Sequence, residues 1–391
     1  MTDRPVILCE PQCRGFEHAL FNAAFLDTVL CAYPRSPVIF LGEEGHLEWV
    51  RQILERHDSR FVSRVTWQAM AIPPQHSAGW RRLPEERAWC RRLFDASAAH
   101  SPLFMGVCSI TPTGLFALKL DLYKRRTNVP TLVVVHSILA SILDRPPRKP
   151  WNWISSLRKV LEMPHPRSLK YVALGEPILR TLLRERRRLG RHFCALDIPY
   201  FEEAAPPATP SGKIRFGHLG VGNRHKGFDR FAQLARETQA WAKGVEFSLV
   251  GFVDDAECMS YVQWIADVGD RPLSPEVYSD RAARLTYAVW LADPRHYRLA
   301  ASASFLDALS YGKPGIYLRN PYVEHYFERM GDIGYLCRDY GEVGQVVSSI
   351  ARDFPAERYR KQCENILQGR RIFEPAGLAP SLQAIVDGMG G

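Results

Sequence analysis

A glycine-rich turn with two cations is the segment of this sequence best suited to chemistry. Residues 215–229 read Arg-Phe-Gly-His-Leu-Gly-Val-Gly-Asn-Arg-His-Lys-Gly-Phe-Asp, an apolar run that ends in glycines and leads into helical periodicity. Glycines let the backbone approach a ligand, and a helix N-terminus favours negative charge. The pattern predicts an anion site formed by Gly222, Arg224 and Lys226, for which diphosphate is the natural ligand.

An ordinary strand–helix connection with surface cations is the simpler interpretation of this turn when it is taken by itself. The segment lacks the G-x-G-x-x-G fingerprint of dinucleotide-binding domains. It also differs from a Walker P-loop, in which Ser or Thr follows Gly-Lys. A second segment is therefore needed before the turn indicates a function.

That second segment spans residues 297–315 and reads Tyr-Arg-Leu-Ala-Ala-Ser-Ala-Ser-Phe-Leu-Asp-Ala-Leu-Ser-Tyr-Gly-Lys-Pro-Gly. Ser304 stands three residues before Asp307, a spacing similar to a capping box at a helix start. With Ser302 it predicts a helix N-terminus suited to phosphate or sugar hydroxyls. A plain capped helix is the alternative. Tyr297 is placed to pack on a sugar or base, or else belongs to the core.

Together and in this order, the two segments resemble the C-terminal domain of glycosyltransferases with the GT-B fold. Residues 226–229, Lys-Gly-Phe-Asp, are similar to the Lys-Gly-hydrophobic-Asp donor-phosphate motif of that superfamily. Residues 304–314 are similar to its Glu-Ala-hydrophobic-Ala-x-Gly-x-Pro segment. The resemblance implies an α/β protein with two Rossmann-like domains facing across a cleft and a nucleoside diphosphate sugar as donor. It implies a donor site that contains Gly222, Arg224, Lys226, Tyr297, Ser302, Ser304 and Asp307.

Two positions depart from the pattern of the superfamily. Many members carry an Arg five residues before the Lys, where this chain has Val221, and Arg224 is a candidate substitute. Retaining members carry two Glu eight positions apart, which correspond here to Leu299 and Asp307. Because the first carboxylate is missing, the sequence favours an inverting mechanism.

The catalytic base implied by the resemblance lies between the first predicted strand and the first predicted helix. In similar inverting enzymes, a His or an acidic residue near the start of this helix activates the acceptor hydroxyl, which points to Glu17 and His18. Similar enzymes also use a His near the donor sugar, which matches His136 after a Leu-Val-Val-Val run. Structural roles remain open for all three: a favourable helix dipole for Glu17, packing for His18 and burial for His136.

Strand-like and helix-like runs alternate in both halves of the chain, which indicates parallel sheets covered by helices. In the first half, apolar runs at 5–9, 37–41, 103–108, 131–135 and 171–174 predict short buried strands. Residues 204–212 have the composition of a linker. We therefore predict an acceptor-binding domain at 1–205 and a nucleotide-sugar-binding domain at 206–391, with a last helix able to pack back on the first domain.

Composition narrows the class of protein further. The 391 residues, 46% hydrophobic and 24% charged, are typical of a two-domain globular protein. Nine scattered cysteines and the absence of a secretory signal predict reduced thiols in the cytoplasm. No Asp-x-Asp motif or zinc-like cysteine pair is present, so we expect no metal and no bound cofactor. The longest apolar run, 131–143, is too short and too polar to span a bilayer.

Positive charge is concentrated in residues 81–200, which hold 22 basic and 9 acidic residues. Here Trp151 and Trp153 begin a helix-like stripe with neighbouring cations, and Arg186, Arg187 and Arg188 lie in a leucine-spaced segment at 179–193. Basic amphipathic segments with Trp bind anionic membrane surfaces. We therefore expect peripheral contact with the inner face of the cell membrane, although two ordinary surface helices would give the same pattern.

The prediction from these features is a metal-independent hexosyltransferase, more consistent with inversion than with retention. It would move a sugar from a nucleoside diphosphate sugar to a lipid-linked saccharide for surface polysaccharide, such as exopolysaccharide. A non-catalytic GT-B-like saccharide-binding protein is one alternative. A basic nucleic-acid-binding α/β protein is another, and the chain carries no RNP1, KH or helix-turn-helix signature.

Overall fold

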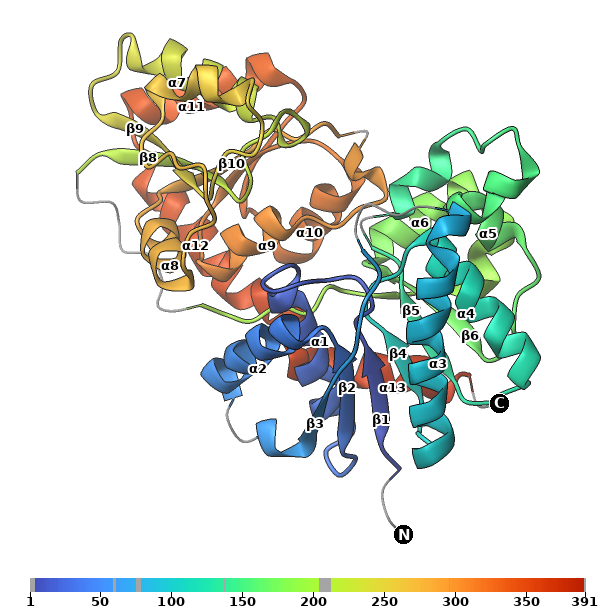
Figure 1. The fold of residues 1–391 in the computed structure, drawn as a ribbon. Coiled ribbons are helices and arrows are strands. Elements are labelled where there is room, and N and C mark those ends of the chain that lie inside the picture. The colour runs from blue at the N-terminus through green and yellow to red at the C-terminus, as the bar shows by residue number, and fades with distance from the viewer. Residues whose placement is uncertain are drawn as a thin grey trace. The chain divides into compact units, whose positions relative to one another are not determined.

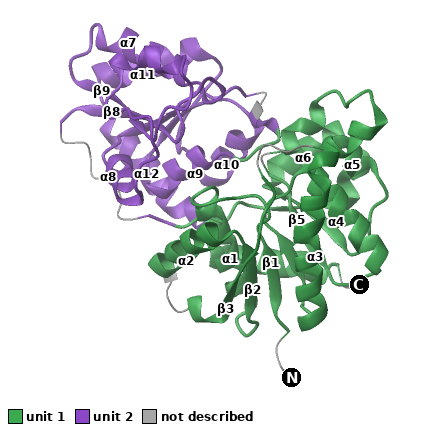
Figure 2. Cartoon of the chain, viewed as in Figure 1, with its two compact units in different colours: residues 1–201, 299–301, 372–391 green, residues 202–298, 302–371 purple. Residues whose placement is uncertain are grey.

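The computed structural model describes residues 4–58, 61–74, 79–136, 138–203, 212–294 and 296–389. By its internal contacts the chain divides into two compact units, coloured green and purple in Figure 2. Unit 1 comprises Met1–Phe201, Leu299–Ala301 and Ile372–Gly391, and unit 2 comprises Glu202–Arg298 and Ser302–Arg371. Most of the predicted linker, residues 204–211, lies outside the described residues, and the domain boundary at 205 stays a prediction.

Unit 1 is built on a seven-stranded parallel sheet in the order β3-β2-β1-β4-β5-β6-β7. Its strands are β1 (Val6–Cys9), β2 (Val38–Gly42), β3 (Val65–Ala69), β4 (Met105–Val107), β5 (Thr131–Val134), β6 (Leu169–Leu174) and β7 (Phe193–Leu196). Strands β1, β2, β4 and β5 are buried along their whole length. Strands covered by helices on both faces need such continuous apolar runs, which explains why the sequence predicted them.

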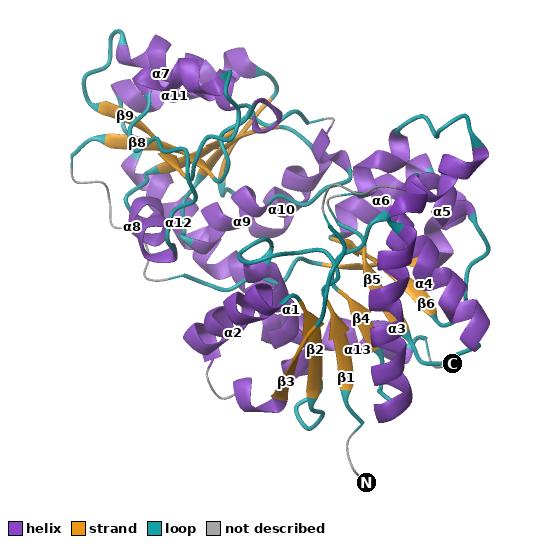
Figure 3. Cartoon of the chain, viewed as in Figure 1, coloured by secondary structure: helices purple, strands orange, loops and turns teal. Residues whose placement is uncertain are grey.

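Helices cover both faces of this sheet (Figures 1 and 3). They are α1 (Ala19–Ala32), α2 (Glu44–Asp58), α3 (Leu83–His100), α4 (Pro112–Arg125), α5 (Leu157–Glu162), α6 (Glu176–Glu185) and α13 (Pro375–Asp387). The 3-10 helices are η1 (Val62–Arg64), η2 (Gly79–Arg81), η3 (Leu139–Leu143), η4 (Pro150–Ser155) and η5 (Arg187–His192). Helix α1 is buried almost all round, because it packs between α2 and α13. The Gln383 amide of α13 donates a hydrogen bond to the Ala32 carbonyl at the end of α1.

The two basic segments with helix-like spacing are each divided in the structure, so continuous amphipathic helices are the wrong description. Ser156 separates η4 from α5, and Arg186 separates α6 from η5, each with an extended or irregular backbone. Leu157 in α5, Leu182 in α6 and Leu189 in η5 are all buried. The leucines therefore belong to the core and leave the cations on the surface.

Unit 2 contains a five-stranded parallel sheet in the order β12-β11-β10-β8-β9. Its strands are β8 (Ile214–Leu219), β9 (Val245–Val250), β10 (Tyr287–Trp290), β11 (Gly315–Leu318) and β12 (Gly334–Cys337). Its helices are α7 (Phe228–Gln239), α8 (Pro275–Ala283), α9 (Ala303–Ser310), α10 (Pro321–Met330), α11 (Tyr340–Arg352) and α12 (Ala356–Gly369). The 3-10 helices along this part of the chain are η6 (Arg224–Lys226), η7 (Cys258–Trp264), η8 (His296–Arg298) and η9 (Arg370–Phe373).

Two hydrophobic clusters lie on the two faces of the unit 2 sheet. The larger packs Phe216, Phe247 and Tyr287 against apolar side chains of α7 and α11, which lie together in Figure 3. The smaller packs Ala288 and its neighbours against α8 and α9. With strands held from both faces, the loops at their carboxyl ends have fixed starting points, and these loops carry the predicted site residues.

Candidate functional site

The glycine turn of unit 2 follows β8 at the carboxyl edge of the sheet, and its shape depends on glycine. Gly220 and Gly227 have φ angles of 88° and 74°, which favour glycine. A Cβ on Gly227 would lie only 2.2 Å from the Leu291 carbonyl oxygen. Asn223 caps η6, because its side-chain oxygen accepts a hydrogen bond from the Lys226 amide at 3.0 Å. The backbone of the turn is thereby fixed in one conformation.

The Lys226 ammonium lies beside Gly220 and next to α9. A Cβ placed on Gly220 would be 3.1 Å from Lys226 Nζ and 3.2 Å from Ser304 Oγ. Loss of hydration lowers the pKa of Lys226, while the charges of Asp307 and Asp254 act in the opposite direction. The absence of a side chain at Gly220 thus lets the Lys226 ammonium and the Ser304 hydroxyl lie close to the backbone at the end of β8.

Helix α9 starts with a different cap from the one that the sequence suggested. Ser302, not Ser304, is the N-cap, and its Oγ accepts a hydrogen bond from the Phe305 amide at 3.2 Å. The buried Ser304 hydroxyl donates to the Leu219 carbonyl at 2.7 Å, so it ties the first turn of α9 to the end of β8. The capping box at Ser304 and Asp307 is therefore wrong, because the tie to β8 occupies the Ser304 hydroxyl.

The other predicted donor-site residues have partners within unit 2. Asp307 accepts a hydrogen bond from the Tyr278 hydroxyl at 2.6 Å. Arg224 is exposed and forms an ion pair with Glu257. The half-buried Tyr297 ring meets Trp290 edge-on, with ring centroids 4.7 Å apart. The structure thus brings Lys226, Ser304 and Asp307 together, and the roles of Arg224 and Tyr297 toward a ligand stay predictions. Gly222 lies against the Phe228 ring, where a Cβ would be 3.1 Å from it.

A hollow of about 400 Å³ at the carboxyl edge of unit 1 contains the three predicted catalytic residues. It is formed by residues that follow β1, β4 and β5, together with one residue before α3. Its lining consists of Gln12, Cys13, Glu17, His18, Arg82, Ser109, Thr111 and His136. Residues that lie far apart in the sequence therefore meet around one space.

The two histidines of this hollow are in direct contact. Their ring centroids are 4.9 Å apart in an edge-on arrangement. His18 is the N-cap of α1 and has a left-handed backbone with φ of 50°, a conformation that costs about 1–2 kcal/mol outside glycine. Burial and the neighbouring His18 lower the pKa of His136 to about 3, so its ring is neutral. His136 Nε2 is buried without a hydrogen-bond partner, which a polar ligand group would supply.

Buried polar side chains that the sequence did not reveal hold the loop between β1 and α1. Glu10 Oε1 accepts hydrogen bonds from the Gln12 and Cys13 amides at 2.9 and 3.2 Å. The Asn22 amide donates to Glu10 Oε2 at 3.1 Å and to His46 Nε2 at 2.8 Å. His46 must then carry its proton on Nδ1, which lies 2.8 Å from the Gly15 carbonyl. This network positions the loop that presents Glu17 and His18.

Arg82 is the other residue of the hollow that sequence reasoning missed. Its side chain is buried and pairs with the buried carboxylate of Glu86, with Nε and Oε1 2.5 Å apart. Glu86 also accepts hydrogen bonds from the Thr111 hydroxyl at 2.6 Å and from the Trp89 indole. A guanidinium held in this way is a fixed hydrogen-bond donor at the wall of the hollow, and Glu86 compensates its charge. No local pattern marks Arg82, because it is one of many arginines in this half of the chain.

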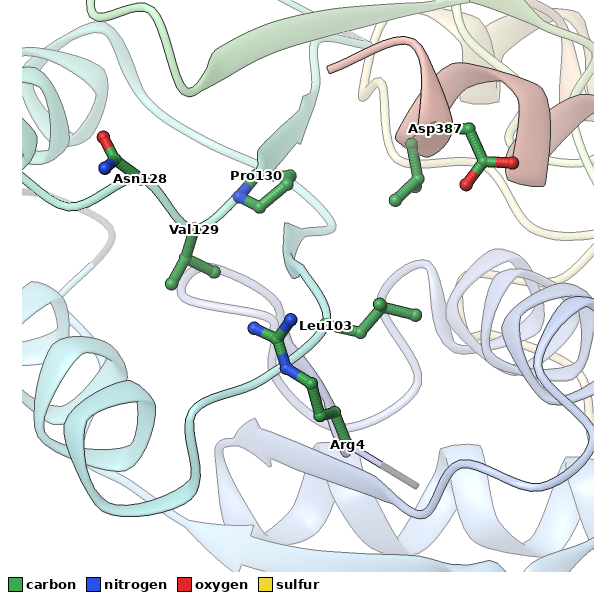
Figure 4. Close-up of a pocket in the computed structure, with 7 residues that line it drawn as sticks. Arg4, Leu103, Asn128, Val129, Pro130 and Asp387 are labelled. Atoms are coloured by element: carbon green, nitrogen blue, oxygen red, sulfur yellow. The ribbon is translucent and has the colours of Figure 1, made fainter. Parts of the chain in front are cut away.

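Unit 1 also has a second hollow, of about 590 Å³ (Figure 4). It does not contain the candidate catalytic side chains of the first hollow. It lies at the amino ends of β1, β4 and β5, opposite the edge that carries His18 and His136. Arg4 and Asp387 are its charged residues, and Leu103, Val129 and Pro130 supply apolar surface. The Arg4 guanidinium donates to the Ser101 carbonyl at 2.9 Å. We assign no function to this hollow.

The residues predicted for membrane contact fall into two separate groups. Trp151 and Trp153 are 57% and 37% exposed, and the ammonium groups of Lys149 and Lys159 lie over their rings at 5.5 and 4.8 Å. Arg186, Arg187 and Arg188 instead line a hollow near the amino end of β7. Among the described residues, no helix is long and apolar enough to cross a membrane.

The arrangement of His, Cys, Asp and Glu side chains bears on metal and thiol chemistry. In the described ranges, no group of three or more His, Cys, Asp and Glu side chains is placed to hold a metal ion. All nine cysteines are free thiols. Burial raises the pKa of Cys13, which lines the hollow of unit 1, above the range of a reactive thiolate. Cys13 is therefore not a nucleophile candidate.

Comparison with solved structures shows the fold of this chain. HepE of Anabaena, solved in complex with UDP and glucose, matches with a TM-score of 0.66 at 12% identity, over 98% of this chain and 100% of its own. A glycosyltransferase from Rickettsia africae matches with a TM-score of 0.68 at 8% identity, over 100% and 99%. The catalytic domain of starch synthase IV from Arabidopsis thaliana, bound to ADP and acarbose, matches with 0.67 at 10% identity, over 99% of both chains.

These matches cover essentially the whole chain, and they confirm the predicted fold class. The protein has the α/β GT-B fold, with two parallel sheets of seven and five strands. No protein-family model matches the sequence, and no curated protein sequence matches it. At 8–12% identity the likeness concerns the fold, so the activity has to be argued from the sites themselves.

Proposed function

We propose that this protein is a glycosyltransferase that transfers a sugar from a nucleoside diphosphate sugar to an acceptor bound in unit 1. The observation that carries the proposal is the glycine turn at the end of β8, where the Lys226 ammonium and the first turn of α9 meet beside Gly220. Open α/β sheets bind their ligands at this edge. HepE, which shares the fold, has also been solved with UDP-glucose.

Lys226 is proposed to stabilise the diphosphate as the bond to the sugar breaks. The leaving group gains negative charge in the transition state, and a desolvated cation interacts with it more strongly there than in water. The N–H groups of the glycine turn contribute further, and Gly222, Ser302 and Tyr297 complete the proposed donor site. Arg224 would also bind the diphosphate once phosphate oxygens replace the Glu257 carboxylate as its partner. This scheme stabilises the leaving group with protein cations, without a metal ion.

His18 or Glu17 is proposed to accept the proton of the acceptor hydroxyl. As the acceptor oxygen forms its bond to the anomeric carbon, the bond from that carbon to the diphosphate oxygen breaks, which inverts the configuration. Both side chains line the same hollow, and the loop that carries them is fixed by Glu10 and His46. His136, whose neutral ring has a buried nitrogen without a partner, is proposed to hydrogen-bond to a sugar hydroxyl.

The acceptor is proposed to be a lipid-linked saccharide for surface polysaccharide, with a hexose as the transferred sugar. The supporting features are the local positive charge of residues 81–200 and the exposed Trp151 and Trp153 beneath their lysines. Tryptophan and lysine together suit the interface of an anionic membrane. We therefore propose peripheral attachment to the cytoplasmic face of the membrane.

A turnover assay tests the proposed activity. The protein is incubated with UDP-, GDP-, ADP- and dTDP-sugars and membrane lipid extract, and release of nucleoside diphosphate is followed with transfer of labelled sugar. At least one donor should be consumed, and Lys226→Ala should abolish most of this consumption. Binding of a donor without any turnover would instead identify a non-catalytic saccharide-binding protein. NMR of the product anomer distinguishes inversion from retention.

A further inference from the structure

A third hollow in unit 1 is strongly basic, and the proposed reaction does not use it. It encloses about 650 Å³ between the ends of α5 and α6. Its lining includes Arg186, Arg187, Arg188 and Arg191, together with His165 and His192. His165 precedes β6 and His192 directly precedes β7, so the hollow lies at the amino ends of these parallel strands. The hollow with His18 and His136 lies at the carboxyl ends, which makes the two spaces distinct.

The four arginines of this basic hollow differ from other arginines of the chain in their ion pairing. In the part of the chain that the structure describes, none of them forms an ion pair. Arginines elsewhere commonly do, as in the pairs of Arg338 with Glu342 and Arg360 with Glu364. The acidic residue of the lining, Glu162, is already paired with Arg158 at 3.1 Å and Lys159 at 3.3 Å. The positive charge of the hollow is therefore not neutralised by the protein.

Additional cationic and polar groups surround this charge. The buried Lys119 ammonium donates to the Val160 and Met163 carbonyls at 2.8 and 3.0 Å, directly behind the wall. Arg186 Nε is buried without a hydrogen-bond partner. Buried donors in native proteins are normally paired, so an unpaired guanidinium nitrogen indicates a missing acceptor. Four cations held close together also repel one another unless an anion joins them.

The His165 and His192 rings also line the hollow and do not add to its charge. They stack with centroids 3.7 Å apart. Burial, followed by the neighbouring cations, lowers the pKa of both, to about 4 for His165. His192 Nε2 accepts a hydrogen bond from Arg191 Nε at 3.1 Å, which orients that guanidinium within the lining. The arginines are thus the charged groups available to a ligand.

We propose that this hollow is a binding site for a phosphate-bearing anion, separate from the donor and acceptor sites. Arginine forks match the oxygen geometry of phosphate and bind it through paired hydrogen bonds. The volume exceeds that of inorganic phosphate and accommodates a larger phosphorylated group. Either the headgroup of an anionic lipid or a soluble phosphate compound supplies this chemistry. The assignment does not rest on the proposed glycosyltransferase activity, because it concerns the other edge of the sheet.

The test compares two triple variants. Both also carry Lys226→Ala, so that phosphate binding at the proposed donor site is weakened and does not mask binding in the hollow. The first is Arg187→Gln/Arg188→Gln/Arg191→Gln, which changes exposed arginines of the hollow. The matched control is Arg91→Gln/Arg92→Gln/Lys124→Gln, which removes the same charge from exposed positions on α3 and α4. Pyrophosphate binding is measured by calorimetry. Sedimentation is measured with phosphatidylglycerol and phosphatidylcholine vesicles at about 0.1 M salt, where screening extends over roughly 10 Å.

We expect the variant of the hollow to bind at least one probe about tenfold or more weakly than the control variant, since each lost charge-assisted contact has an effect of this order. A loss confined to pyrophosphate identifies a soluble phosphate compound as the ligand. A loss confined to phosphatidylglycerol vesicles identifies a lipid headgroup, and a loss for both identifies a site that takes either. If the two triple variants bind both probes equally, the proposed site is overturned. Far-UV circular dichroism checks that both variants fold.

Discussion

The loops that follow the first strand of each unit are held in a fixed conformation by different kinds of interaction. After β8, the chain turns through glycines with positive φ, and the Lys226 ammonium lies inside the turn. After β1, the chain is held by side chains, chiefly the Glu10 carboxylate and the His46 ring. A turn that offers backbone N–H groups and one cation suits a diphosphate, which is recognised mainly by its negative charge. A hollow walled by varied side chains suits a ligand whose hydroxyls must be distinguished.

The largest effect is expected from removing the base in the unit 1 loop. His18→Ala or Glu17→Gln, whichever replaces the true base, should lower kcat by ~10²–10⁴ and leave the affinity for nucleoside diphosphate unchanged. Steady-state kinetics and calorimetry measure the two quantities separately. His100→Ala, at the exposed end of α3, is the control. Wild-type turnover in both variants would place the base elsewhere and would favour a retaining mechanism.

The second largest effect is a loss of stability when Gly227, in the turn after β8, is replaced by Ala, compared with the same change at an unconstrained glycine. In Gly227→Ala the new Cβ would lie 2.2 Å from the Leu291 carbonyl oxygen, at a φ of 74°. Backbone strain and overpacking together should lower the free energy of unfolding by about 2–3 kcal/mol. Gly244→Ala, with no atom within 4 Å of the new Cβ, should be nearly neutral. Equal stability of the two variants in urea unfolding would show that the turn relaxes freely.

Acidification should affect both units through one buried histidine in each, His136 after β5 and His218 within β8. Burial lowers the pKa of both His136 and His218 to about 3. The next largest cause is the charge of His18 for His136 and the charge of Lys226 for His218. The unfolded chain takes up these protons below pH 6.5, while the folded protein does not, so stability is lost as the pH falls from 6.5 toward 3. At pH 5 the loss is about 2 kcal/mol for each histidine. His136→Gln and His218→Gln should each reduce the difference between unfolding free energies at pH 7 and pH 5, and an unchanged difference would contradict the assignment.

The smallest effect concerns the tryptophan group of unit 1. Lys149→Gln/Lys159→Gln should weaken binding to phosphatidylglycerol vesicles at low salt, by ~1 kcal/mol for each lysine. Lys243→Gln/Lys361→Gln removes the same charge from unit 2 and serves as the control. Binding of the wild type should also decline at about 0.5 M salt, where the screening length is roughly 4 Å. Equal binding to phosphatidylcholine vesicles would exclude charge-driven membrane contact.

The contrast between the loops also explains what could be predicted from the sequence. A glycine turn is a local pattern, so the segment around Lys226 and its resemblance to the GT-B fold were visible in consecutive residues. The fold class was confirmed by structures that share only 8–12% of residues, because alternating buried strands and helices define it. The predicted site residues themselves remain to be tested by the variants above.

The side-chain network of unit 1 could not be predicted in the same way. Glu10 follows a strand, His46 lies in the first turn of a helix, and Arg82 precedes another helix. Only the folded sheet brings Glu10 and His46 to the loop after β1 and Arg82 to the hollow beside it. A carboxylate directly after a buried strand is the one weak signal, and it does not reveal its partners. The basic hollow was partly visible as a run of arginines. That these arginines form no ion pair with any described residue follows from tertiary structure alone.

The most direct test of the central claim is a calorimetric titration of UDP into the wild type, Lys226→Ala and Lys243→Ala. The glycine turn with its ammonium predicts saturable binding by the wild type and by Lys243→Ala. Lys226→Ala should bind at least tenfold more weakly, equivalent to roughly 1.5–3 kcal/mol for a charge-assisted contact, with its fold intact. If a guanine, adenine or thymine nucleotide binds in place of UDP, the same ratio is expected for it. Equal affinity of Lys226→Ala and the wild type would contradict the account.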